Sequence, residues 1–295
     1  MTPPVTLPLS PTLRRGIARA PALVIAPDSG LSRLDDVVIE APLEIRVAGD
    51  PLAVTMRTPG EDRFLALGFL FAEGIIHALD DIGTVAHCGH PGERGYGDTL
   101  EVTPAGGARL DLSRLDRARR TGLTTSSCGI CGRDGIDDLL ARIGEIPVDA
   151  STTIAEELLG RAPDLLSAAQ HNFARTGGLH AAAAIDAAGT LVAFAEDIGR
   201  HNAVDKVVGK LLYQHQLPRE LPATPPILLM VSGRASFEIV QKAATAGFPC
   251  VASVSAASSL AIETAAATGV TLAAFTRAGR FTLYSHAERI TIRPR

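Results

Sequence analysis

The chain has 295 residues, of which 46% are hydrophobic, and its formal net charge is −4 at pH 7. A chain of this length and composition can bury a large core without disulfides, in one large domain or two smaller ones. The charge gives no overall electrostatic reason to bind nucleic acid or an anionic membrane. Apolar runs such as residues 227–231 are far shorter than the roughly 20 residues that span a bilayer, and the N-terminus lacks the order of a secretory signal. We therefore expect a cytoplasmic protein.

The first half of the chain predicts a small, mostly β part. Residues 1–30 are rich in proline and turn residues, and we expect them to form a loosely ordered arm. Short apolar stretches then predict strands, and an apolar pattern with helical spacing and an acidic first turn predicts a helix from Phe64 onward. The strands are expected at residues 37–39, 43–47, 52–56, 82–88 and 99–112.

In the second half, predicted strands alternate with predicted helices, which is typical of an α/β layer with a largely parallel sheet and an antiparallel end. The strands are expected at 179–185, 191–195, 226–231, 250–255, 271–276 and 280–286, and the helices at 154–170, 202–213, 235–246 and 257–267. The predicted fold class is α/β, with a mixed sheet, flanking helices and a smaller, mostly β N-terminal part. After the arm, we expect an α+β domain at 31–125, a cysteine loop with its following helix at 126–150 and an α/β domain at 151–295.

The most distinctive motif is the pair Cys128 and Cys131, within the sequence SSCGICG. Four arginines precede the pair and a helical pattern follows it, and both features favour the thiolate form. The spacing alone leaves three chemistries open: a redox dithiol, half of a zinc site and a sulfur relay. The other two cysteines, Cys88 and Cys250, are isolated in the sequence, which disfavours a disulfide framework and indicates a reducing compartment.

A zinc site is the alternative with the most specific residues. His87, Cys88 and His90 lie in another loop and could supply the ligands that Cys128 and Cys131 do not. Their spacing matches no standard pair of metal knuckles, so we predict no resident metal.

Polar loops at three ends of predicted strands form a second candidate site. The sequences EDIGRHN at 196–202 and SGRAS at 232–236 each follow a strand and begin a helix, and a third loop leads into the strand that starts at His180. Helix N-termini and small polar residues suit phosphate groups, although ordinary caps and turns have the same composition. The candidate cofactor-binding residues are His180, Asp197, Arg200, His201, Asn202, Ser232, Gly233, Arg234 and Ser236.

Read together, several motifs resemble the formate dehydrogenase accessory sulfurtransferase family. The resemblance extends from about residue 38 to residue 284 and rests on VTMRTPGED with GFLFAEGII at 54–76, SCGICG at 127–132, TGGLHAA at 176–182, EDIGRHNAVDK at 196–206, SGRASFEIVQK at 232–242 and the AFTR and RFTLY stretches near the end. Each motif is weak alone, whereas their ordered combination is specific.

The resemblance implies a sulfur carrier. Cys128 and Cys131 would accept sulfane sulfur from a cysteine desulfurase as a persulfide and pass it to a molybdenum or tungsten bis-molybdopterin guanine dinucleotide, which formate dehydrogenase needs in its catalytic subunit. This cofactor would be bound transiently, and no cofactor would be held permanently. The resemblance also implies a homodimer and a cytidine deaminase-like fold for residues 151–295.

Two other functions remain open. One is a zinc-binding, deaminase-like hydrolase, but the zinc ligand of deaminases has a catalytic glutamate beside it, whereas His180 is followed by Ala181 and Ala182. The other is a non-catalytic molybdenum cofactor chaperone, in which the thiols would be dispensable.

Overall fold

The computed structural model describes residues 16–27, 29–90, 93, 95–106, 110, 140, 143–147, 152–214, 217 and 226–292. The pair Cys128 and Cys131 and most of the helix expected after it lie outside the described residues. No helix in the described ranges is long and apolar enough to cross a membrane.

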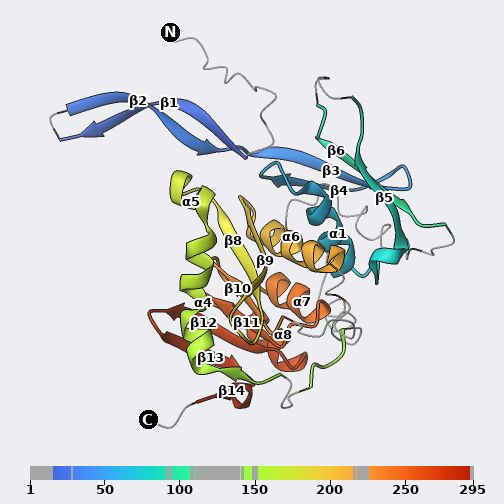
Figure 1. Cartoon of the computed structure of the whole chain (residues 1–295), viewed down its shortest axis with the longest axis vertical. Coiled ribbons are helices and arrows are strands. Elements are labelled where there is room, and N and C mark those ends of the chain that lie inside the picture. The colour runs from blue at the N-terminus through green and yellow to red at the C-terminus, as the bar shows by residue number, and fades with distance from the viewer. Residues whose placement is uncertain are drawn as a thin grey trace.

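The described part of the chain starts just before a hairpin that projects from the body of the molecule (Figure 1). Its strands β1 (Ile17–Ala26) and β2 (Ser29–Val38) pair antiparallel along their whole length. The expected loose arm at 1–30 is therefore wrong from residue 17 onward, because the turn residues around Pro27 close a hairpin. The hairpin exposes the apolar side chains of Leu23, Val24, Ile25, Leu31 and Leu34.

A four-stranded sheet follows, in the order β4-β3-β6-β5. Its strands are β3 (Ala41–Val47), β4 (Asp50–Arg57), β5 (Ile82–His87) and β6 (Thr99–Pro104). The predicted hairpin of β3 and β4 is confirmed, with a turn at Ala48 and Gly49 that both have positive φ. The strand expected at 99–112 ends at Pro104, since proline has no N–H to continue the ladder.

The second sheet has six strands in the order β13-β12-β11-β10-β8-β9. They are β8 (His180–Ile185), β9 (Leu191–Asp197), β10 (Leu228–Val231), β11 (Cys250–Ser253), β12 (Thr271–Arg277) and β13 (Arg280–Ser285). In this sheet only the pairs β10–β11 and β11–β12 are parallel. The sheet is less parallel than expected, because the short β8–β9 connection permits only an antiparallel pair, and β8 also pairs antiparallel with β10.

Helices cover both faces of this sheet. Ala181, Ala183 and Ile185 of β8 pack in the core formed with α4 (Glu156–Ala169), whereas Ala182 and Ala184 belong to the core on the other face. That second face is covered by α6 (Arg200–Tyr213), α7 (Phe237–Thr245) and α8 (Ser259–Ala267). Small alanines on both faces of β8 let the helix layers approach closely, which confirms the predicted mixed sheet with flanking helices.

Short elements complete the chain. The pair β7 (Ile154–Ala155) and β14 (Ile290–Thr291) lies beside the start of α4, and single 3₁₀ turns occur at Leu79–Asp81 and Ala287–Arg289. Helix α5 (His171–Thr176) occupies the polar segment that we expected to be a loop. It forms because Glu196 accepts hydrogen bonds from the first free N–H groups of this helix, those of Asn172 and Phe173.

The two halves of the chain share one core where helix α1 (Asp62–Ala72) crosses α6. Gly68 of α1 lies against the backbone of Asp205, and Gly209 of α6 lies against the backbone of Phe64. A Cβ at either glycine would collide with a carbonyl oxygen of the other helix. The crossing therefore depends on two residues without side chains.

We predict that Gly68→Ala destabilises the protein by about 3 kcal/mol, because the added methyl group forces the two helices apart. Gly106→Ala is the control, since a Cβ at Gly106 meets no atom within 4 Å, and we expect a change within about 0.5 kcal/mol. Chemical denaturation followed by circular dichroism measures both. Equal stability of the two variants would contradict the close crossing.

Candidate functional site

Three loops that carry the candidate residues meet at one end of the six-stranded sheet. His180 begins β8 and is the register partner of Asp197 at the end of β9. Because β8 is also antiparallel to β10, the end of β10 and its loop 232–236 lie beside the same end of β8. The Ser232 hydroxyl fixes this arrangement by accepting a hydrogen bond from the Ala181 N–H at 2.9 Å.

Asp197 is completely buried and holds the loops together. Its Oδ1 accepts hydrogen bonds from the N–H of Gly199 at 2.8 Å and from Asn202 Nδ2 at 3.0 Å. Its Oδ2 lies 2.7 Å from Lys206 Nζ and accepts a hydrogen bond from the N–H of Thr58 at 3.2 Å. With both oxygens engaged, the carboxylate is placed to position other residues rather than to meet a ligand.

Asn202 has a similar role. Besides its bond to Asp197, its Nδ2 donates to the carbonyl of Met56 at 2.8 Å, and its Oδ1 accepts from the Thr55 hydroxyl at 3.2 Å. The end of β4 is thereby joined to the first turn of α6. Among the candidate residues, Asp197, Asn202 and Ser232 thus form the framework of the site.

The remaining candidates form a second group, which we call the cationic cluster after its two arginines. Its residues are His180, Arg200, His201, Gly233, Arg234 and Ser236. A Cβ placed on Gly233 would lie 3.3 Å from His180 Nδ1 and 3.5 Å from Arg200 Cβ, so these side chains flank the glycine closely. Burial and the positive charges of Arg200, His201 and Arg234 lower the pKa of His180. His180 is therefore neutral at pH 7 and offers a hydrogen bond rather than a charge.

Arg200 carries the clearest sign of a ligand site. Its Nε is buried and has no hydrogen-bond partner within the described part of the chain. A buried donor without a partner is costly, and an acceptor brought by a ligand would satisfy it. Arg234 is exposed on the neighbouring loop, so two guanidinium groups are available to an anion here.

His201 joins the first turns of α6 and α7. Its Nε2 lies 3.1 Å from the Ser236 hydroxyl, and its Nδ1 lies 2.6 Å from Glu238 Oε2. Glu238 is not among the residues predicted from the sequence, because an acid in the first turn of a helix is already explained by the helix dipole. Nothing in its local sequence indicates a partner 37 positions earlier.

A buried ion pair lies beneath the site. Lys242 Nζ of α7 contacts Asp205 Oδ1 of α6 at 2.7 Å, and both side chains are almost fully buried. Burial raises the pKa of Asp205 to about 6, even though the charge of Lys242 acts in the opposite direction.

The zinc alternative also used a second loop, with His87, Cys88 and His90 as candidate ligands. His87 Nε2 lies 3.4 Å from Asp62 Oδ2, which also pairs with Arg57, and Cys88 is an exposed free thiol. The described residues contain no group of three or more His, Cys, Asp or Glu side chains that could hold a metal ion. The part of this alternative that involves Cys128 and Cys131 lies outside the described residues.

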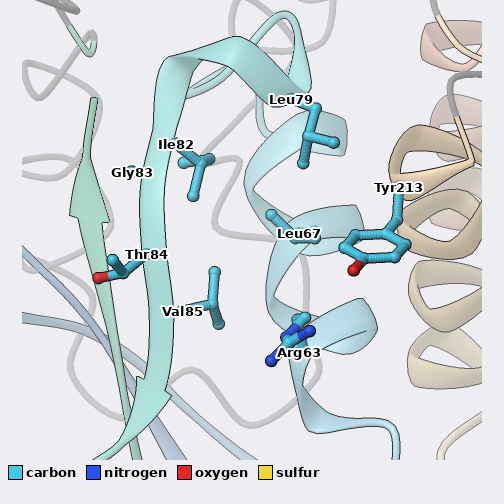
Figure 2. A pocket seen from close by; sticks show the side chains of 8 residues that line it. All are labelled: Arg63, Leu67, Leu79, Ile82, Gly83, Thr84, Val85 and Tyr213. Atoms are coloured by element: carbon cyan, nitrogen blue, oxygen red, sulfur yellow. The ribbon is translucent and has the colours of Figure 1, made fainter. Parts of the chain in front are cut away.

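A groove of about 400 Å³ lies apart from these residues, between α1, β5 and the end of α6. Figure 2 shows Arg63 and Tyr213 beside the apolar side chains of Leu67, Leu79, Ile82 and Val85. The groove shares no residue with the cationic cluster.

The fold and the site define a mixed α/β protein with a cluster of cationic side chains at the strand ends. The model of the FdhD/NarQ family matches residues 38–291, and the chain therefore belongs to this family. The predicted resemblance is confirmed.

Relatives match over nearly the whole chain. A protein named sulfur carrier protein FdhD from Anaeromyxobacter sp. (strain K) is 51% identical over 283 residues, which are 95% of this chain and 97% of the relative. A protein of the same name from Mycobacterium tuberculosis (strain ATCC 25618 / H37Rv) is 44% identical over 276 residues, which are 90% of this chain and 96% of the relative.

A solved structure shares the fold. The crystal structure of a protein from Desulfotalea psychrophila, assigned as a formate dehydrogenase accessory protein, matches with a TM-score of 0.70 and 22% identity. The match covers 93% of this chain and 99% of that protein. At this identity the likeness shows the fold alone; the expected likeness to cytidine deaminases stays a prediction.

We predict that Asp205 makes the stability of the protein fall as the pH rises from 4 to 7. The folded chain keeps the Asp205 proton up to about pH 6, while the unfolded chain loses it near the ordinary aspartate pKa of 3.8. In this window the folded state binds more protons, so raising the pH lowers the free energy of unfolding. The Asp205→Asn variant has no carboxyl group to titrate at this position. As the pH rises, the wild type should therefore lose stability relative to this variant.

Urea denaturation at pH 4.5 and pH 7 measures this difference. The control is Asp80→Asn at an exposed position, which should follow the pH profile of the wild type. A stability difference between the wild type and Asp205→Asn that does not change with pH would contradict the prediction.

Proposed function

We propose that this chain is a sulfur carrier that serves the maturation of formate dehydrogenase. Its family and the names of its relatives support the carrier role, and the assignment of the solved structure supports the link to formate dehydrogenase. In this proposal, a cysteine desulfurase donates sulfane sulfur to Cys128 or Cys131. The recipient is the molybdenum or tungsten bis-molybdopterin guanine dinucleotide of the formate dehydrogenase catalytic subunit.

The sulfur-accepting step needs only the thiols of the chain. A thiolate of the pair attacks the terminal sulfur of the donor persulfide, the donor S–S bond breaks, and the donor cysteine leaves as a thiolate. One sulfur atom moves and the charge is conserved, so the step needs no external oxidant. The second thiol, three positions away, is close enough in sequence to take part in relaying the sulfur.

The buried, unpartnered Nε of Arg200 is the observation that most supports binding of the guanine dinucleotide. The cofactor carries pyrophosphate groups, and a cationic cluster at the first turns of α6 and α7 suits them in charge and in donor geometry. Arg200 and Arg234 would hold phosphate oxygens, and His180 and Ser236 would donate further hydrogen bonds beside Gly233. His201, whose ring nitrogens face Ser236 and Glu238, would hold Ser236 in place. The framework residues Asp197, Asn202 and Ser232 would keep these donors in place.

The proposal also includes the predicted cofactor use, localisation and oligomeric state. The cofactor would be a transient substrate rather than a resident group, and the carrier would act in the cytoplasm as a homodimer. The apolar side chains exposed on the β1–β2 hairpin, such as Leu31, support self-association, because exposed apolar patches commonly mark protein contacts.

We predict that incubation with a cysteine desulfurase and cysteine adds sulfur to the peptide that contains Cys128 and Cys131. Mass spectrometry detects the adduct, and the double variant Cys128→Ala with Cys131→Ala should show none and fail to mature formate dehydrogenase. Cys88→Ala is the matched control, since it removes an exposed thiol outside the pair and should leave both readouts unchanged.

Two other outcomes would each support one of the alternative functions. Maturation by the double variant would contradict the carrier role and support the cofactor chaperone. Stoichiometric zinc in protein purified without added metal, lost on mutation of Cys128, would support the zinc-binding alternative.

We also predict that guanosine diphosphate, which contains the guanine and pyrophosphate of the cofactor, binds at the cationic cluster. Arg200→Ala and Arg234→Ala should each weaken binding about tenfold, because each removes charge-assisted hydrogen bonds. Arg33→Ala is the control, since Arg33 lies on the hairpin and pairs with Asp35. Isothermal titration calorimetry measures the affinities. Absence of binding, or equal affinities in all variants, would refute this part of the proposal.

A further inference from the structure

Ser236, His201 and Glu238 form a chain of contacts that persulfide formation on the cysteine pair does not require. His201 Nε2 faces the Ser236 hydroxyl at 3.1 Å, and His201 Nδ1 faces Glu238 at 2.6 Å. A nucleophile, a base within hydrogen-bond reach and a carboxylate that orients the base are the elements of nucleophilic catalysis by serine. Both distances fall in the range of such sites.

The structure contains an internal comparison for Ser236. The β10–α7 and β11–α8 units are parallel neighbours, with Ala235 bridged to Ala257, so that Ser236 and Ser258 occupy equivalent positions. Both are N-cap residues with nearly the same backbone angles, φ −94° and ψ 168° for Ser236 and φ −92° and ψ 159° for Ser258.

The two hydroxyls are used differently. The Ser258 side chain accepts a hydrogen bond from Ala261 N, which is the ordinary role of a serine at this position. The Ser236 side chain makes no such cap and contacts His201 instead. Because the Ser236 hydroxyl makes no capping bond, it is available to act as a nucleophile.

The triad is also within reach of small molecules. The His201 side chain is 10% exposed and the Glu238 side chain 17% exposed, and Ser236 is half-buried. The base is therefore shielded by protein without being sealed off. The first turn of α7, which begins directly after Ser236, places a helix N-terminus beside the hydroxyl, where negative charge is stabilised.

We propose that Ser236, His201 and Glu238 are a catalytic triad that hydrolyses carboxylic esters with an anionic group. Arg200 and Arg234 on the same two loops would bind that group, and Ser236 would attack the ester carbonyl. This activity goes beyond the proposed sulfur-carrier function and does not depend on it, because it involves neither Cys128 nor Cys131.

The reaction balances with water as the only co-reactant. Ser236 Oγ bonds to the carbonyl carbon while its proton moves to His201 Nε2; the bond to the leaving alkoxide then breaks, and that alkoxide takes the proton. Water next attacks the acyl-serine, gives a proton to His201, and the carbon–Oγ bond breaks as Ser236 recovers a proton. Glu238 holds the imidazole and faces the positive charge that forms on it. The sum is ester plus water to acid plus alcohol.

The test uses the full-length protein, a fluorophosphonate probe and 4-acetoxybenzoate, an ester whose free carboxylate is the anionic group. We expect the probe to label Ser236, located by mass spectrometry, and we expect turnover of the ester. Ser236→Ala should abolish both, and His201→Gln should slow labelling about 10²-fold or more. Inorganic pyrophosphate should protect Ser236 by occupying the arginines. Ser258→Ala is the matched control, since it removes the equivalent serine and should leave the labelling of Ser236 unchanged.

Other outcomes of these measurements would contradict the triad. Labelling of Ser236 no faster than labelling of Ser258 would overturn the proposal, as would an unchanged rate in His201→Gln. If His201→Gln does not fold, Ser236→Ala decides, because it removes only a hydroxyl that makes no helix cap. Ester turnover that persists in folded Ser236→Ala would exclude the triad.

Discussion

The carboxylate of Asp197 is the interaction on which the arrangement of this protein depends. It is completely buried and receives donors from Thr58, Gly199, Asn202 and Lys206. Breaking such a buried pair by removing one partner typically costs about 3–5 kcal/mol, since the remaining charge is left unpaired. Because the donors come from the loop after β4, the end of β9 and helix α6, one side chain fixes the positions of three segments.

The crossing of α1 and α6 makes this network possible. Gly68 and Gly209 let the two backbones touch, and Lys206, on the same helix as Gly209, donates a hydrogen bond to the Thr58 carbonyl at 3.1 Å as well as pairing with Asp197. A wider crossing would pull the loop after β4 away from α6. The packing of small residues and the buried charges are therefore parts of one constraint, which sets the direction of the first turn of α6 and of Arg200 within it.

Much of the fold could be predicted because its signals are local. The helices α1, α6, α7 and α8 and the strands of the second half follow from apolar spacing, and the three ligand-like loops follow from polar residues at strand ends. The hairpin β1–β2 could not be predicted, because an exposed strand pair lacks the apolar alternation that a core imposes. The antiparallel placement of β8 beside β10 was missed for another reason: strand order is a property of the whole sheet.

The roles within the site show the same limit. Asp197 and Arg200 look alike from the sequence, as charged residues in one polar loop. Only the fold shows that Asp197 is fully engaged in hydrogen bonds whereas Arg200 Nε has no partner among the described residues. His201 and Glu238 are far apart in sequence and meet because α6 and α7 begin side by side. Local composition therefore indicated which polar loops lie at the strand ends, while long-range packing determines the contacts that each residue makes.

The balance of buried charge also determines what the site can bind. Lys206 and Lys242 are buried beside the site, and each pairs with an aspartate at 2.7 Å. Arg200 and Arg234 have no carboxylate partner among the described residues that form salt bridges. Burial lowers the pKa of His180, and the charges of these arginines lower it further. The positive potential is thus concentrated at the surface of the site and not beneath it. An anion bound there would neutralise the arginines without competing with the ion pairs that hold the fold, so ligands could bind and leave while Asp197 and Asp205 keep their partners.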